Sequence, residues 1–405
     1  MRTVATYRYL LTGSGLILLV CLIMYGCKEK YAAPVTDVNP NYFVVEGLIN
    51  TGSDSTIFTL SRTFKLDNKA VVAPEKAAIV QVESEAGNVY VLPELVKSGS
   101  YGRPALGLDQ TKRYRLRIRT KDNKEYLSDF VESKTSPAID DIKLEFRNNI
   151  MFINANTHDP SGKSRYYRYS YIETWQHDAQ IQALFKVENH QILLRNFPEE
   201  DIYHCWTTVP SSSIILGATT GLTEDRLADK RLIGIPALSP KLTAEYSILV
   251  KQSVLTKEAF EFLEAMQKNT ERVGGIFDAQ PSQLFGNIRS VTNSSEVVIG
   301  FISAGTLTEK RFTVTPADLQ DGYWHQKDSL IYCFEGVERL LFKDARFGDR
   351  VKNELTGPDK PYYIPINVYW PAGAPMLTGY YATSLTECVD CRMQGGTNKK
   401  PTFWK

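Results

Sequence analysis

The sequence lacks a surplus of charge of either sign, because 47 Lys and Arg residues face 46 Asp and Glu residues in a chain of 405. A protein that binds a nucleic-acid backbone needs a basic surplus, so this balance argues against nucleic acid as a partner. Long apolar runs are also scarce. A single run near the N-terminus is long enough to matter, which excludes a polytopic membrane protein. The length of the chain instead favours two globular domains.

Catalytic motifs are missing too. The chain has five histidines and contains no Gly-x-Ser-x-Gly elbow, no His-Glu-x-x-His pair and no phosphate-binding glycine loop. Catalytic triads assemble in space, so an uncharacterised hydrolase stays as the third interpretation. An enzyme is the less favoured class, and no catalytic residue, cofactor or metal site is predicted.

The N-terminus is where the apolar run lies. Arg2 and Arg8 precede an apolar stretch over residues 10–25, which is shorter than the roughly 20 residues of a membrane-spanning helix. A basic start followed by a short apolar segment is typical of a secretory signal rather than of folded structure. We therefore interpret residues 1–26 as a signal peptide and residues 27–41 as a tether.

Gly26-Cys27 resembles the lipobox of bacterial lipoproteins, and by that resemblance Cys27 becomes the lipid-bearing mature N-terminus. Met24-Tyr25 departs from the usual lipobox, which leaves a plain signal peptide or an uncleaved anchor as the alternative. Lys28-Glu29-Lys30 partly resembles the charged export tag of surface lipoproteins in the Bacteroidota. We expect a lipid anchor in the outer membrane, with the cell-surface side favoured over the periplasmic side.

From Tyr42 onward the sequence has the texture of β-structure. The segment Arg113–Arg119 alternates perfectly, which predicts that Tyr114, Leu116 and Ile118 are buried while four arginines, Arg113, Arg115, Arg117 and Arg119, point outward. Short strands at this spacing, without a helix, indicate an immunoglobulin-like β-sandwich over residues 42–136. The outward arginines can meet phosphates or an acidic partner, or they form a solvated face with carboxylates on neighbouring strands.

Residues 137–405 predict a larger antiparallel β domain with longer strands and one inserted α-helix. Thr256 can cap this helix near 256–270, and four apolar residues fall on one face of it: Ala259, Phe262, Leu263 and Met266. The last sixty or so residues are rich in Pro, Gly and Tyr, so we expect loops packed on the sheet there.

Several segments stand out together: Phe43–Ile49, Tyr114–Ile118 leading to Tyr126–Asp129, Ile276–Pro281, Gly286–Ile288, Ile299–Phe301, and the tail Cys388–Arg392, Gly395–Pro401 and Phe403-Trp404. In order and spacing they resemble a Bacteroidota lipoprotein family catalogued as domain of unknown function 4249. The resemblance covers nearly all of the chain after the signal, and the tail is its most specific part. It implies an envelope lipoprotein, commonly considered beside TonB-dependent outer-membrane transporters, and it implies no known reaction.

Four cysteines lie beyond the signal region: Cys205, Cys333, Cys388 and Cys391. In an exported protein four thiols indicate two disulfides. Three pairings are open; Cys388–Cys391 with Cys205–Cys333 is slightly favoured. Zinc is the rival, because Cys388 and Cys391 have ligand spacing and His204-Cys205 can complete the set. No second spaced Cys/His pair exists, so disulfides are preferred.

The aromatic strand over residues 166–175 is the strongest candidate for a ligand platform. Its alternate residues Tyr167, Tyr169, Tyr171 and Trp175 share one face, where rings can stack on a sugar or grip a peptide. The structural alternative is a β core whose tyrosine hydroxyls reach the rim.

Together these features predict a lipid-anchored envelope lipoprotein that acts as an accessory or ligand-binding partner of a TonB-dependent β-barrel transporter. The alternative is a structural or adhesion-type surface lipoprotein with no small ligand.

Overall fold

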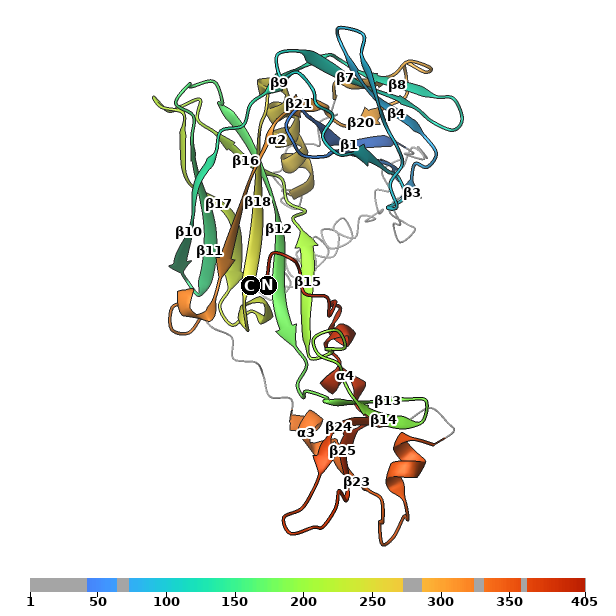
Figure 1. Cartoon of the computed structure of the whole chain (residues 1–405). Coiled ribbons are helices and arrows are strands. Elements are labelled where there is room, and N and C mark those ends of the chain that lie inside the picture. Colours follow the sequence, from blue (N-terminus) through green and yellow to red (C-terminus); the bar gives the residue numbers. More distant parts are fainter. Residues whose placement is uncertain (1–41, 64–72, 272–285, 324–330, 358–362, 405) are drawn as a thin grey trace, which may run out of the picture. The chain divides into compact units, whose positions relative to one another are not determined.

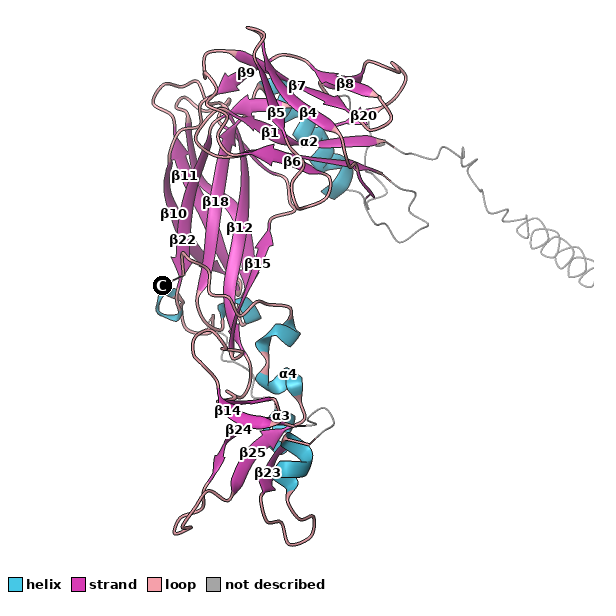
Figure 2. Ribbon diagram, turned by 45° about the vertical axis from the view of Figure 1, so that its right-hand side comes forward, coloured by secondary structure: helices cyan, strands magenta, loops and turns pink. Residues whose placement is uncertain are grey.

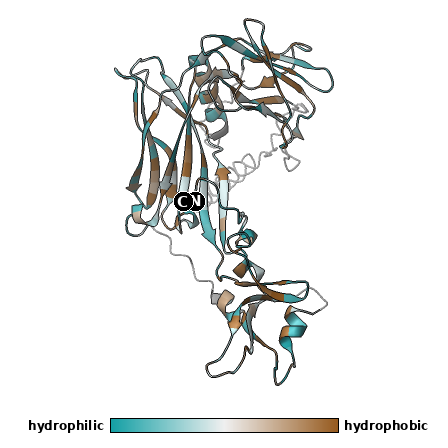
Figure 3. Ribbon diagram, in the orientation of Figure 1, coloured by the Kyte–Doolittle hydropathy of each residue, from teal (hydrophilic) through white to brown (hydrophobic). Residues whose placement is uncertain are grey.

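The computed structural model describes residues 42–63, 73–271, 286–323, 331–357 and 363–404. It confirms a mainly β fold, in which strands outnumber helices throughout the described residues (Figures 1 and 2). Figure 3 shows hydrophobic residues, in brown, spread along the strands next to hydrophilic ones in teal. This mixture is expected for strands that turn one face toward a core.

The first sandwich is built from strands that pair into one 12-stranded sheet, folded so that its two halves enclose a core. Its members are β1 (Phe43–Asn50), β2 (Thr56–Arg62), β3 (Ala73–Pro74), β4 (Ile79–Ser84), β5 (Val89–Leu92), β6 (Ser100–Arg103), β7 (Arg113–Arg119), β8 (Glu125–Ser128), β9 (Val131–Lys134), β19 (Ile288–Ser290), β20 (Val298–Ile299) and β21 (Ser303–Gly305). The alternation of β7 determines its burial, since Tyr114, Leu116 and Ile118 are buried as predicted.

The last three strands of this sandwich come from far along the chain. β20 and β21 pair in parallel with β1, and β21 also pairs with β9. Ile302, next to β21, is fully buried in the same core as Phe43. The predicted second domain over residues 137–405 is therefore corrected, because residues 288–305 return to complete the first sandwich.

The second sandwich packs a three-stranded sheet against a five-stranded one, with the core between them. The smaller sheet contains β10 (Ile139–Arg147), β11 (Ile150–His158) and β17 (Arg226–Pro236). The larger contains β12 (Tyr166–Asp178), β15 (His204–Pro210), β16 (Ile215–Ala218), β18 (Tyr246–Val254) and β22 (Leu307–Val314). All pairs within both sheets are antiparallel. Short 3-10 turns lie at Pro240–Leu242 and Pro316–Asp318.

One long helix, α2 (Lys257–Glu271), interrupts the strands where the sequence predicts it. The Thr256 hydroxyl accepts a hydrogen bond from the Ala259 backbone N–H at 3.2 Å, which is the expected cap. Ala259 and Phe262 are buried and Leu263 is half-buried, so the apolar face is turned inward. Within the described residues, no helix has the length and apolar character needed to cross a membrane.

The C-terminal part corrects the expectation of loops alone. A three-stranded sheet forms from β23 (Val337–Leu341), β24 (Ile364–Tyr369) and β25 (Gly379–Thr383), with β25 in the centre. The hairpin β13 (Phe185–Glu188) and β14 (Gln191–Leu194) packs against it through Phe185 and Tyr380, whose ring centroids are 5.4 Å apart. The short helical segments are α3 (Ile331–Glu335), a π-helical turn (Val351–Leu355), α4 (Thr386–Val389) and a 3-10 turn (Cys391–Gln394).

Candidate functional site

The predicted lipidation site, Cys27, lies outside the described residues, as do the signal segment 1–26 and the tether 27–41. The other predicted site residues are described and can be placed.

The four remaining cysteines form two disulfides, Cys205–Cys391 and Cys333–Cys388, with Cα–Cα distances of 5.7 and 5.6 Å. The favoured pairing Cys388–Cys391 is therefore wrong. These two residues lie on successive helical turns and reach partners in different parts of the chain. The sulfurs are engaged in bonds, so they are not available as zinc ligands. Among the described residues no group of three or more His, Cys, Asp or Glu could hold a metal ion.

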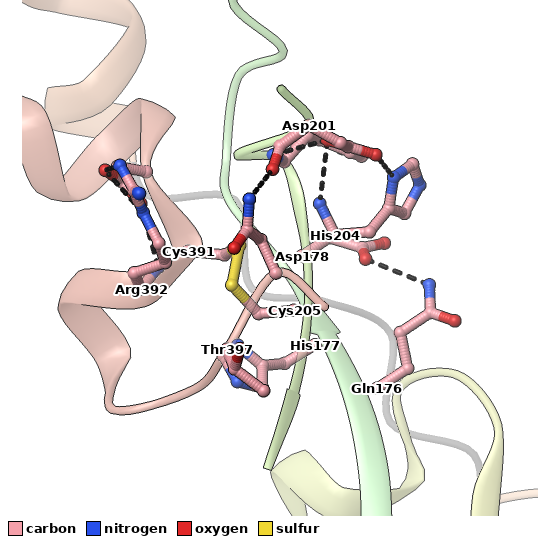
Figure 4. The surroundings of a disulfide bond; sticks show 12 residues. Gln176, His177, Asp178, Asp201, His204, Cys205, Cys391, Arg392 and Thr397 are labelled. Atoms are coloured by element: carbon pink, nitrogen blue, oxygen red, sulfur yellow. Dashed lines mark hydrogen bonds and ion pairs between the residues drawn. A yellow bond between two sulfur atoms is a disulfide. The ribbon is translucent and has the colours of Figure 1, made fainter. Parts of the chain in front are cut away.

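The two bridges fix the C-terminal segment against earlier parts of the chain. Figure 4 shows Cys391 joined to Cys205 on β15, beside His204, Asp201 and Thr397. Backbone hydrogen bonds continue this attachment, since Cys391 N–H donates to the Ile202 carbonyl at 2.9 Å and Trp206 pairs with Thr397. The segment is held by covalent and hydrogen bonds together.

The proposed tyrosine platform is corrected by burial. Tyr167 and Tyr169 are at most 1% exposed, Tyr171 is buried as well, and Trp175 packs against the same core. The Tyr167 hydroxyl donates to Asp225 Oδ1 at 2.8 Å inside the sandwich. The three tyrosine rings are core residues of the second sandwich and Trp175 is half-buried against that core, so the four do not form an open platform.

The opposite face of the same strand is the one that remains open. Successive side chains of β12 alternate between the two faces of the sheet, so Arg168 and Ser170 point away from the tyrosines. In the pairing with β18, Arg168 is opposite Ser253 and Ser170 is opposite Lys251. This register gathers two cations and two hydroxyls on one small area of the outer face.

These four residues line a cavity of about 210 Å³, which we call the β12–β18 pocket. Its other wall is apolar and is formed by Leu48, Leu255, Ala259, Leu263, Phe301 and Leu307. α2 supplies two of these side chains, Ala259 and Leu263. The pocket therefore has a polar floor on the sheet and an apolar side under the helix.

Arg168 is the unusual charge of this pocket. Desolvation by the surrounding protein lowers the pKa of its guanidinium, and the charge of Glu46 opposes that effect only from a distance. Its side chain nevertheless keeps contact with solvent, and no described residue hydrogen-bonds or ion-pairs with it. Lys251, in contrast, is paired with Glu309. Arg168 is thus a solvent-exposed cation that lines the cavity and has no bonding partner among the described residues.

The arginines of β7 are mostly satisfied within their own sheet. Arg115 Nε and Arg117 Nε contact the two oxygens of Glu83 at 2.7 and 2.5 Å, and Arg117 also pairs with Glu125. Arg113 donates to the Phe130 carbonyl at 2.7 Å. This arrangement is the solvated face with neighbouring carboxylates.

The four histidines that the structure describes do not assemble one catalytic site. His158 Nδ1 lies 2.8 Å from Asp140 on an exposed strand end, and His204 Nδ1 lies 2.7 Å from Asp201. His177 Nε2 contacts the Thr207 hydroxyl at 3.0 Å, but Gly396 packs directly on that ring. His190 bonds to backbone carbonyls, and His325 lies outside the described residues.

The end of the C-terminal sheet carries a second candidate, which sequence reasoning missed. The last residues of β23 and β24, Leu341 and Tyr369, both pair with Gly379, the first residue of β25. The loops 342–350 and 370–378 that follow them therefore leave the sheet at the same end. Three large apolar side chains on these loops are more than half exposed: Phe347 at 66%, Trp370 at 59% and Met376 at 68%. We call these three residues the aromatic tip. Figures 1 and 2 show both loops extending beyond the sheet.

The tip loops are held by their own hydrogen bonds. The Asp344 carboxylate accepts bonds from the N–H groups of Arg346 at 2.8 Å and Phe347 at 3.0 Å, while Asp344 and Gly348 pair through their backbones. In the other loop, Trp370 Nε1 donates to the Ala374 carbonyl at 2.9 Å. Phe347 and Trp370 are therefore displayed by ordered turns rather than by loose chain.

The model of the family described as Domain of unknown function (DUF4249) matches residues 28–311. The chain belongs to this family. The matched range ends before the tail Cys388–Trp404, so the evidence for family membership comes from residues 28–311 and not from the tail. A comparison with curated proteins finds no match.

Two solved structures are similar to parts of the chain. The FN1–FN3 domains of chicken CNTN1 share 12% identity, with 53% of this chain and 59% of that chain covered and a TM-score of 0.16. A segment of two fibronectin type-III domains from chicken tenascin shares 16% identity, with 54% and 92% covered and a TM-score of 0.16. The chain thus spans 59% of the CNTN1 segment.

Five of the segments behind the family resemblance lie in the first sandwich, and three of them contact one another there. Phe43–Ile49 forms most of β1, and Ile299-Gly300-Phe301 runs beside it. A Cβ on Gly300 would lie 2.4 Å from the Val45 carbonyl oxygen, so only glycine permits this approach. Asn287 then clamps Ile302 with two hydrogen bonds of 2.7 and 2.8 Å. The fold explains why these residues occur at these positions.

Proposed function

We propose that this DUF4249 protein is a lipid-anchored lipoprotein of a Bacteroidota-type envelope and an accessory partner of a TonB-dependent outer-membrane transporter. Gly26-Cys27, at the end of a short apolar segment, supports the anchor. Lys28-Glu29-Lys30 favours the cell-surface side. The family membership is compatible with this location and carries no reaction with it.

The observation that supports a protein partner is the aromatic tip. Aromatic residues and Met are enriched at protein–protein interfaces, and Trp is one of the residue types enriched among the few that contribute most of the binding energy. Phe347, Trp370 and Met376 lie on two loops at the same end of a small sheet, whereas single exposed apolar residues scattered over a surface need no explanation. A purely structural spacer has no use for three such side chains on ordered turns.

A tagged pull-down from gently solubilised native outer membranes tests this function. We expect a TonB-dependent β-barrel to co-purify in near-equal amount with the wild type and to be lost with the double variant Phe347→Ser and Trp370→Ser. The matched control is Val89→Ser with Val91→Ser, which removes two exposed apolar side chains from β5. Recovery of the wild type alone would leave the spacer or adhesion alternative in its place.

The anchor has its own test. Cys27→Ala removes the sulfur that the lipid would occupy, so the protein should move from the membrane fraction to the soluble fraction after cell lysis. Metabolic labelling with a palmitate analogue should mark the wild type and not the variant. Unchanged membrane retention of Cys27→Ala would show that lipidation is not the main tether.

A further inference from the structure

The β12–β18 pocket combines a cation that lacks a partner with an apolar wall. Arg168 lies on the floor, surrounded closely enough that desolvation lowers the pKa of its guanidinium, and none of the described residues satisfies its donors. A guanidinium has five N–H donors in a planar fork that matches a carboxylate or phosphate bidentately. The residues on the floor of the pocket therefore favour the binding of an anion.

The neighbours of Arg168 extend this preference. Lys251 keeps donors beyond the one used for Glu309, because an ammonium group has three. Ser170 and Ser253 add hydroxyls from the same face of the sheet. The charges of Glu309 and Glu46 partly offset the two cations, so the pocket suits a single negative charge better than a polyanion.

The apolar wall determines which non-ionic part of a ligand fits the pocket. Leu263 from α2 and Phe301 line the side of the pocket away from the sheet, and Leu307 on β22 adds an apolar side chain next to Ser253. A volume of about 210 Å³ corresponds to roughly seven waters at their share of liquid volume. A hydrocarbon part of a few carbons fills this space, whereas a long acyl chain does not.

We infer that the β12–β18 pocket binds a small amphiphilic monoanion, a carboxylate with a short hydrocarbon chain. Arg168 and Lys251 hold the carboxylate, the two serine hydroxyls donate to it, and the wall under α2 covers the chain. This site is independent of the aromatic tip, so a failed pull-down leaves it standing and its own failure leaves the partner proposal standing.

The experiment uses the full chain in lipid nanodiscs, with empty nanodiscs as the blank, and measures binding by titration calorimetry and saturation-transfer NMR. The probes are hexanoate, hexanol, decanoate and inorganic phosphate. We expect saturable binding of hexanoate, at least tenfold weaker binding of hexanol, and no gain for decanoate over hexanoate. Phosphate that binds as tightly as hexanoate would overturn the inference, because the apolar wall would then have no role. Tighter binding of decanoate would overturn the short chain and indicate a lipid as the source.

Variants separate the pocket from the rest of the surface. Arg168→Gln should weaken hexanoate binding at least tenfold, and Leu263→Trp, which fills the cavity, should abolish it. Arg119→Gln makes the same change of charge at an exposed arginine on β7 and should leave binding unchanged. Thermal melting of each variant shows whether it is folded. Hexanoate binding that is equal in folded Arg168→Gln and wild type would overturn the assignment.

Discussion

Glu173 is a carboxylate buried inside the second sandwich, with 6% of its surface exposed. It accepts hydrogen bonds from Lys241 Nζ at 2.6 Å and from the Tyr246 hydroxyl at 3.1 Å. Burial, followed by the charge of Glu173, raises the pKa of Tyr246. The Lys241 ammonium also lies 4.8 Å from the centre of the Trp175 ring. A buried charge is tolerated here because each of its partners is in place.

Removal of the Glu173 carboxylate or of the Tyr246 hydroxyl should show how far stability depends on this hydrogen-bonded network. We expect Glu173→Ala to lower the free energy of unfolding by about 3–5 kcal/mol, because Lys241 and the Tyr246 hydroxyl lose their acceptor. Tyr246→Phe should cost only about 1 kcal/mol. Urea denaturation followed by circular dichroism measures both. Glu132→Ala, at an exposed pair with Lys134, is the control and should change little; similar losses for the two glutamate variants would contradict the buried network.

Glu83 gives a pH prediction at the same scale. Burial alone would raise the pKa of this carboxyl, but the hydrogen bonds and charges of Arg117 and Arg115 outweigh it and lower the pKa below 4.5. A carboxyl whose pKa is lower in the folded state binds protons more readily when unfolded, so it stabilises the fold above the unfolded pKa. That contribution should disappear as the pH falls from about 4.5 through the folded pKa.

The measurement is a series of denaturation curves between about pH 7 and pH 3. Glu83→Gln should be less stable than the wild type near neutral pH, and the difference should shrink as the medium becomes acidic. A difference that stays constant with pH would mean that Glu83 acts through packing and not through its charge.

Strand β12 illustrates how the packing of secondary-structure elements determines which of its side chains can contact a ligand. Its tyrosines and its Arg168 alternate along one strand, and the alternation was visible in the sequence. The aromatic residues led to the prediction of a ligand platform on one face of β12. That face is buried because the three-stranded sheet packs against it across the core. The same alternation read for the other face would have identified Arg168 and Ser170. For the aromatic tip, the signal was Trp370 and Met376 within a Pro- and Gly-rich stretch.

The C-terminal element depends on its disulfides. Cys205–Cys391 spans 186 residues and Cys333–Cys388 spans 55, so their loss should free a large loop in the unfolded chain. On loop-entropy grounds the long bridge contributes about 5 kcal/mol and the shorter one about 4. Cys205→Ser with Cys391→Ser should thus lower the unfolding midpoint more than Cys333→Ser with Cys388→Ser.

Thermal melts with and without a reductant measure this order. Reduced wild type should melt like the variant that lacks all four cysteines. Hydrogen exchange should also speed up in residues 386–404 when Cys205–Cys391 is removed, because that bridge fixes the segment to β15. Unchanged exchange there would mean that the backbone pairing of Trp206 with Thr397 is sufficient.

At the scale of the whole molecule, the chain leaves the first sandwich and returns to it. Ile288, Val298, Ile302 and Ala304 contribute to its core, and β21 lies between β1 and β9. α2 and all strands of the second sandwich except β22 are encoded between these two parts of the first sandwich, and β22 follows residues 288–305. The first sandwich is consequently not an independent module of consecutive sequence.

A fragment of residues 42–136 should therefore fail to fold. It lacks the strands that pair with β1 and β9, which leaves their edges open and part of the core exposed to water. We expect no cooperative thermal unfolding and aggregation at micromolar concentration, while the full chain unfolds cooperatively. A dispersed NMR spectrum from the fragment alone would contradict this dependence.

Local patterns in the sequence determined much of this protein. The period of two in β7 specified which residues it buries, and the cap at Thr256 with its apolar spacing specified α2, because these features depend on neighbours a few residues away. The presence of two disulfides followed from the number of cysteines beyond the signal region.

Contacts between distant residues were decided only by the tertiary structure. The pairing Cys205–Cys391, the return of residues 288–305 to the first sandwich and the open face of β12 each depend on which strands meet, and no local period encodes that choice. Arg168 lies at a pocket because α2 and Phe301 line the same cavity, although its side chain stays exposed to solvent. Alternation assigns two faces to a strand, and packing alone determines which one is left for a ligand.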